Sequence, residues 1–127
     1  MRLRNAVLAT TMVALGSFAL PSLAHHAATM FDRNEVVELT GEVVEFQFTA
    51  PHIWIEVRVE NDDGETEEWS VEGGTPNRLF RAGWRPNSFK PGDQVIIRGN
   101  PLRDGGRAAL FIGARLADGS TLGNFDE

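Results

Sequence analysis

The chain has 127 residues, of which 42% are hydrophobic and 24% are charged, and it contains no cysteine. This length suits one compact domain and is too short for two. The absence of cysteine excludes disulfides, thiolate metal sites, thiol catalysis and a lipid anchor on cysteine. With 12 Lys and Arg against 18 Asp and Glu, the net charge is −6. Such a charge repels a phosphate backbone, so we expect no nucleic-acid partner.

The first segment, residues 1–24, has the order of a secretory signal peptide. Arg2 and Arg4 precede an apolar, uncharged run, and the small residues Ser22 and Ala24 end the segment. The apolar run is shorter than the ~20 residues that a membrane-spanning helix needs, so an uncleaved membrane anchor is the less favoured alternative. We predict cleavage after Ala24, a periplasmic or secreted location, and no stable membrane anchor after cleavage.

Alternation of apolar and polar residues predicts five strands in the rest of the chain. The first strand, residues 35–49, changes its apolar face midway, and Gly41 stands just before the change, where a bulge or sharp bend is expected. The second strand, residues 52–60, has the most regular alternation, and Asp63-Gly64 predicts the hairpin turn that follows it. Further strands are expected at residues 67–72, 94–99 and 108–116.

One short helix is predicted between the third and fourth strands. Thr75 is a suitable N-cap, and Pro76 suits the first helical position because its missing N–H costs nothing there. Residues 77–82 can make about two turns, and Gly83 can end them.

The order of three strands, a short helix and two strands, with a long and bent first strand, is typical of the OB-fold. We therefore predict an all-β fold with one short helix, namely a five-stranded OB-like Greek-key barrel. The alternative is another small antiparallel barrel or sandwich with a helical cap. The barrel is expected over residues 35–117, between an N-terminal arm at residues 25–34 and a polar C-terminal tail at residues 118–127.

The three histidines are the candidate metal ligands. If cleavage follows Ala24, His25 begins the mature chain and offers both its free amine and its ring Nδ1 to one metal ion, and His26 follows it. His52 begins the second strand and is the remaining imidazole that the arm could meet. Such nitrogen ligands suit Cu(II), so copper is the candidate cofactor, although imidazole also suits zinc and nickel. The alternatives are that His25 and His26 are solvated, and that His52 bonds a backbone carbonyl.

Trp54 is the candidate ligand-binding residue outside the histidines. It lies among charged residues on the polar face of the second strand, where an exposed indole could stack on a sugar ring or an extended peptide. The alternative is that the short helix or the arm covers Trp54, and that Trp69 and Trp84 belong to the core.

We find no convincing catalytic residues. Ser70 and Ser88 lack the G-x-S-x-G signature of a nucleophile, and the acidic residues fall on outward strand positions. We therefore expect a binding module rather than an enzyme, and an oxidase or oxygenase with copper on an N-terminal histidine is a minor alternative.

Short motifs are spread along nearly all of the chain after residue 24. In chain order they are His25-His26, Met30-Phe31-Asp32, Leu39-Thr40-Gly41, Pro51-His52-Ile53-Trp54, Glu72-Gly73-Gly74, Pro76-Asn77, Gly83-Trp84 and Lys90-Pro91-Gly92-Asp93.

Together these motifs resemble a family of exported bacterial proteins that carries only the label of a domain of unknown function. Typical members have H-H-S-F in the arm and N-P-H-x-W before the second strand, whereas Ala27, Ala28 and Ala50 replace the Ser, Phe and Asn here. The resemblance implies a small exported β domain and supplies no activity, cofactor or catalytic residue. The residues add one hypothesis, a periplasmic module that binds copper through His25, His26 and His52. The alternative is a metal-free peptide- or glycan-binding domain that uses Trp54.

Overall fold

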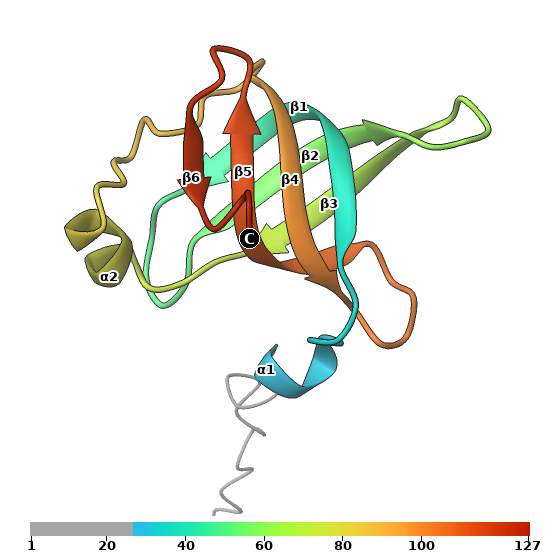
Figure 1. Cartoon of the computed structure of the whole chain (residues 1–127), viewed down its shortest axis with the longest axis horizontal. Coiled ribbons are helices and arrows are strands. Elements are labelled where there is room, and N and C mark those ends of the chain that lie inside the picture. The colour runs from blue at the N-terminus through green and yellow to red at the C-terminus, as the bar shows by residue number, and fades with distance from the viewer. Residues whose placement is uncertain (1–26) are drawn as a thin grey trace, which may run out of the picture.

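The computed structural model describes residues 27–127. The predicted signal peptide, its cleavage point, His25 and His26 therefore lie outside the described residues. None of the helices in residues 27–127 is long and apolar enough to cross a membrane. The elements, drawn in Figure 1, are α1 (Ala27–Met30), β1 (Val37–Gln47), β2 (Trp54–Glu60), β3 (Thr66–Glu72), α2 (Pro76–Arg81), β4 (Gln94–Pro101), β5 (Ala108–Leu116) and β6 (Thr121–Gly123).

The strands form one sheet in the order β3-β2-β1-β4-β5-β6, and β3 also pairs with β5. All neighbouring pairs are antiparallel except β3 and β5, which run parallel over Ser70–Glu72 and Ala108–Leu110. This last pairing closes the first five strands into a barrel (Figure 1). The predicted OB-like barrel is confirmed.

β1 bends so that it can pair with β2 and with β4. Gly41 lies in the stretch that pairs on both sides, and a Cβ atom there would lie 2.0 Å from the carbonyl oxygen of Arg58. A register shift follows between Val43 and Glu45, so Val44 is the bulged residue. After the bulge the inward positions change phase, and Phe46 packs on the core. The predicted change of face near Gly41 is therefore confirmed.

The core fills the barrel and extends under α2. Val43, Ile55, Val57, Val71 and Ile97 are completely buried inside the barrel. Trp84 and Phe89, which follow α2, pack edge-on against each other with their ring centres 5.7 Å apart and cover one end of the barrel. As predicted, the Thr75 side chain caps α2, accepting a hydrogen bond from the N–H of Arg78, and Pro76 begins the helix.

The C-terminal segment, which was expected to be a polar tail over residues 118–127, is partly structured instead. It contains β6, which pairs with β5, and the Phe125 side chain is buried. Arg98 donates hydrogen bonds to the carbonyl oxygens of Phe125 and Glu127. Strand alternation did not reveal β6 because three residues are too few to show a period.

The described part of the N-terminal arm packs on the connection between β4 and β5. Phe31 is buried and forms a β-bridge with Leu102. The N–H of Asp32 donates to the carbonyl oxygen of Pro101 at 2.8 Å, and the N–H of Arg103 donates to that of Met30 at 2.9 Å. The segment that follows His25 and His26 in the sequence is thus attached to the barrel.

Candidate functional site

His52 lies on the connection between β1 and β2, just before Ile53. Backbone hydrogen bonds fix this position, because the N–H of Ile53 donates to the carbonyl oxygen of Gly74 at 3.0 Å and the N–H of Gly73 donates to that of Ile53 at 2.9 Å. Ile53 is fully buried and holds the chain on the core. Its neighbour His52 therefore points to the outer side of the barrel, on the same face as Trp54.

The imidazole of His52 is paired with the carboxylate of Glu72. Nδ1 of His52 donates a hydrogen bond to Oε1 of Glu72. The side chain of Glu72 is only 6% exposed, whereas that of His52 is 39% exposed. Among residues 27–127 we find no hydrogen-bond partner for Nε2 of His52. The contact fixes the ring orientation and leaves Nε2 available to a ligand.

Glu72 lies between two outward-facing neighbours on the adjacent strands. Trp54 on β2 and Leu110 on β5 are its register partners. These two side chains and His52 explain how a carboxylate on the outer face of a barrel can be almost completely buried. A carboxylate so placed is costly without a hydrogen-bond donor, and His52 provides that donor.

Trp54 is partly buried and lies outside the hydrophobic core. Trp84 is a core residue and Trp69 packs against the core from its edge. The expectation that these two tryptophans belong to the core therefore holds fully for Trp84 and in part for Trp69. Trp54 alone places part of its indole on the outer face.

The outer face around this cluster is acidic. Register places Glu56 and Arg58 of β2 beside Ser70 and Glu68 of β3. The Ser70 hydroxyl donates to Glu56 at 2.7 Å, and Arg58 lies 3.7 Å from Glu68. This face corresponds to the one that OB-folds use for oligonucleotides, and its carboxylates oppose a phosphate backbone.

Only one of the three predicted metal ligands lies in the part of the chain that the structure describes. His52 is described, and His25 and His26 lie outside the described residues. Within residues 27–127, no group of three or more His, Cys, Asp or Glu side chains could hold a metal ion. A metal ion bound by His52 would therefore need further ligands from outside residues 27–127.

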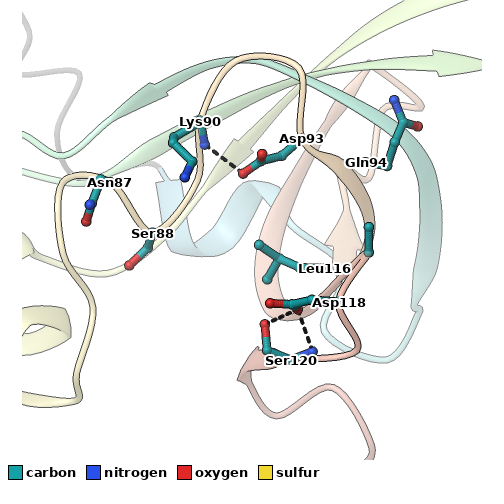
Figure 2. A pocket seen from close by; sticks show the side chains of 9 residues that line it. Asn87, Ser88, Lys90, Asp93, Gln94, Leu116, Asp118 and Ser120 are labelled. Carbon is teal, nitrogen blue, oxygen red and sulfur yellow. Dashed lines mark hydrogen bonds between the residues drawn. The ribbon is translucent and has the colours of Figure 1, made fainter.

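A second candidate is a shallow cleft of about 410 Å³ between the start of β4 and the β5–β6 turn (Figure 2). Its two carboxylates and Ser120 take part in hydrogen bonds within the cleft. Asp93 accepts from the N–H of Lys90, and Asp118 accepts from both the hydroxyl and the N–H of Ser120. The Ser120 hydrogen bonds lower the pKa of Asp118 below its ordinary value. These contacts build turns, so both carboxylates of the cleft are engaged in the protein's own hydrogen bonds.

Sequence reasoning missed Glu72 as a site residue, although the signal was present. A hairpin turn centred on Asp63 pairs each residue of β2 with a definite residue of β3, and this arithmetic places Glu72 opposite Trp54. Both residues were expected on the polar face. The register would therefore have brought Glu72 beside His52, two residues from Trp54 on the same face.

Comparison with known proteins gives the family. A family model described as "Family of unknown function (DUF6152)" matches residues 13–111, which is well over half of the chain. The chain belongs to this family. The resemblance to a family labelled only as a domain of unknown function is thereby confirmed. No curated protein matches the sequence of this family member.

A solved structure supports the barrel. A crystal structure of the mitochondrial single-stranded DNA-binding protein Rim1 of S. cerevisiae matches with a TM-score of 0.50 and 10% identity, covering 65% of this chain and 93% of that one. A second crystal form of Rim1 matches with a TM-score of 0.47 and 11% identity, covering 65% and 92%. At this identity the likeness shows the fold alone.

Proposed function

We propose that this member of the DUF6152 family is an exported binding module that holds one copper ion and performs no catalysis. His52 would supply Nε2, and His25 would supply its free amine and ring after cleavage behind Ala24, with His26 as the alternative arm ligand. The single observation behind this proposal is that a buried carboxylate fixes His52 through Nδ1 and leaves Nε2 free. Metal-binding histidines commonly have such a carboxylate behind them.

The sequence of residues 1–24 supports the proposal because a leader that is cleaved after Ala24 would leave His25 at the N-terminus. The positive, apolar and small-residue order of residues 1–24 is that of a leader, and its removal would leave an imidazole and an amine on the same residue. An amine and imidazoles form the nitrogen-rich set that Cu(II) prefers.

The test is a titration of Cu(II) into the secreted protein, with mass spectrometry establishing its first residue. We expect uptake of one Cu(II) ion and nitrogen hyperfine structure in the electron spin resonance spectrum. His52→Ala should remove the hyperfine splitting from one nitrogen. One extra residue before His25 should abolish the nitrogen hyperfine structure altogether. Protein that takes up no copper at micromolar concentration would refute the proposal.

Glu72→Gln provides a finer comparison because it keeps the shape of the side chain. A partner behind a metal ligand typically contributes 10- to 100-fold to metal affinity, so we expect copper binding weaker by about that factor. Glu56→Gln is the matched control, since Glu56 lies on the same face and bonds Ser70 rather than His52. Equal copper affinities in the two variants would remove Glu72 from the site.

A second candidate function is metal-free binding of a peptide or glycan on the face of Trp54. The observation in its favour is that the indole is partly exposed and lies outside the core. In a Trp69→Phe background, we expect an N-acetylglucosamine oligomer or an extended peptide to shift the fluorescence of the remaining outer tryptophan. A shift that persists in Trp54→Ala would exclude this function.

A further inference from the structure

One stretch of this acidic protein contains cations and no acidic residue. Residues 73–92 include Arg78, Arg81, Arg85 and Lys90 but neither Asp nor Glu. This stretch forms α2 and the loop that leads to β4. At 20 residues it is the longest stretch of the described chain without an acidic residue, so positive charge is concentrated here.

Three of these cations lie on α2 or just after it, together with an exposed aromatic residue. Arg78 and Arg81 are exposed and lie three residues apart on α2, so they are neighbours on the helix surface. Phe80 is 51% exposed, and the guanidinium carbon of Arg85 lies 3.9 Å from its ring centre. We call Arg78, Phe80, Arg81 and Arg85 the arginine patch. Leu79 packs against the core, so α2 turns these other side chains outward.

The arginines of the patch differ from most others in the described chain. Elsewhere in residues 27–127, Arg98 donates to C-terminal carbonyl oxygens. Four others pair with carboxylates: Arg58, Arg103, Arg107 and Arg115. Arg78 and Arg81 have no ion pair within the described residues, and Arg85 donates to the carbonyl oxygens of Phe80 and Trp84. The charge of the patch is therefore not neutralised by the protein's own carboxylates.

The patch also lies far from the most acidic loop. Figure 1 shows α2 at one end of the longest axis and the β2–β3 hairpin tip, with Glu60, Asp62, Asp63 and Glu65, at the other. Charges farther apart than about 8–10 Å are largely screened at physiological ionic strength. An anionic surface in contact with α2 would therefore be attracted by the arginines and only weakly repelled by the protein's net negative charge.

We propose that the arginine patch docks the protein peripherally on a membrane surface that contains anionic phospholipids. The three guanidinium groups would contact lipid phosphates, and the Phe80 ring would lie at the level of the headgroups. A membrane fits better than a protein partner because the patch is a small projecting tip, whereas a stable protein interface buries about 800 Å² on each side. The docking requires neither copper nor the His52 cluster.

The test compares binding of the secreted protein to two kinds of vesicle in a sedimentation assay. One kind contains phosphatidylglycerol and phosphatidylcholine in equal parts, and the other contains phosphatidylcholine only. We expect binding to the first kind, weakened by salt, and none to the second. Each arginine near such a surface contributes about fivefold, so Arg78→Gln with Arg81→Gln should weaken binding about 25-fold.

The matched control is Arg33→Gln with Arg58→Gln, which changes net charge equally at exposed positions away from α2. Its binding should stay within about twofold of the parent, and circular dichroism should be the same for all proteins. Any leader left on the chain would contribute equally to every variant. Phe80→Ser should weaken binding while leaving its salt dependence unchanged, because no charge is removed.

Several outcomes would overturn the proposal. These are equal binding to both kinds of vesicle, no binding to the phosphatidylglycerol vesicles, and equal losses in the patch and control variants. If the patch variant loses self-association in analytical ultracentrifugation and binds vesicles like the parent, the patch contacts a second copy of the chain instead.

Discussion

The hydrogen bond between His52 and Glu72 joins an exposed side chain to a buried one. If the bond is broken, water can solvate the imidazole but hardly the carboxylate. Water can reach the imidazole, which is 39% exposed, but hardly the carboxylate, which is 6% exposed. Removing His52 therefore leaves a buried acceptor without its donor, whereas changing Glu72 to an amide keeps an acceptor in place. Changing His52 should therefore destabilise the protein more than changing Glu72 to Gln, although both changes affect the same hydrogen bond.

We predict that His52→Ala lowers the free energy of unfolding by about 1–3 kcal/mol and that Glu72→Gln lowers it by less. Adding Glu72→Leu to His52→Ala should restore part of the loss, because the stranded carboxylate is then gone. Urea unfolding of the parent and the three variants measures these free energies. A double variant less stable than His52→Ala would show that the buried carboxylate is satisfied in some other way.

Glu67 makes acid stability depend on one partly buried hydrogen-bond network. The side chain of Asn61, then that of Trp69 and the charge of Arg107, hold the pKa of Glu67 below its ordinary value of 4.5. A carboxylate whose pKa is lowered on folding stabilises the protein above its unfolded pKa, and this stabilisation is lost as the pH falls through the folded pKa.

We therefore predict that the free energy of unfolding declines as the pH falls below about 4.5 and that Glu67→Gln makes this decline shallower. Urea unfolding at a series of pH values checks both statements. Glu68→Gln, on the opposite face of β3, is the control and should follow the parent. Identical pH profiles for parent and Glu67→Gln would contradict the role of this network.

At the scale of elements, β1 is the longest strand of the described chain, and its first part pairs with β4 whereas its second part pairs with β2. At Gly41 the chain passes so close to β2 that a Cβ atom would lie 2.0 Å from the carbonyl oxygen of Arg58. The glycine is needed for this approach of two backbones.

We predict that Gly41→Ala lowers the free energy of unfolding by about 1–3 kcal/mol, because one of the two strands must move. Gly74→Ala is the matched control, since a Cβ atom there would make only ordinary contact with Leu79 at 3.8 Å. Thermal unfolding measures both. A Gly41→Ala protein as stable as the control would mean that β1 can shift at no cost.

β6 depends on the residues that follow it. The guanidinium carbon of Arg115 lies 4.4 Å from the ring centre of the buried Phe125, which holds the C-terminal segment against β5. We predict that Phe125→Ala speeds amide hydrogen exchange in β6 and leaves β1 protected, because short edge elements open locally. Hydrogen exchange resolved by residue tests this. Equal acceleration in β1 would mean that β6 opens only with the whole barrel.

At the scale of the whole molecule, Trp84 joins the barrel to the segment around α2. It is almost fully buried, and its ring centre lies 5.1 Å from that of Phe111 and 5.7 Å from that of Phe89. It thereby connects β5 with the loop before β4. Trp69, at the barrel edge, is only partly buried.

We predict that Trp84→Ala costs about 3–5 kcal/mol and that Trp69→Ala costs clearly less, because only the first leaves a large internal cavity. Denaturant unfolding at neutral pH provides the comparison. A larger loss in Trp69→Ala would show that the aromatic cluster around Trp84 can collapse into the space.

The sequence by itself determined the five barrel strands, the capped helix, the bend near Gly41 and the OB-like order, because each follows from periodicity and turn chemistry within a few residues. Only the tertiary structure decided that Glu72 is buried behind His52, that Phe31 and Phe125 anchor the chain at both ends of the described part, and that α2 lies at the opposite end of the molecule from the acidic β2–β3 hairpin tip. These features join residues far apart in the chain. Strand register and barrel closure bring these residues together, and a pattern of neighbouring residues in the sequence does not show such contacts.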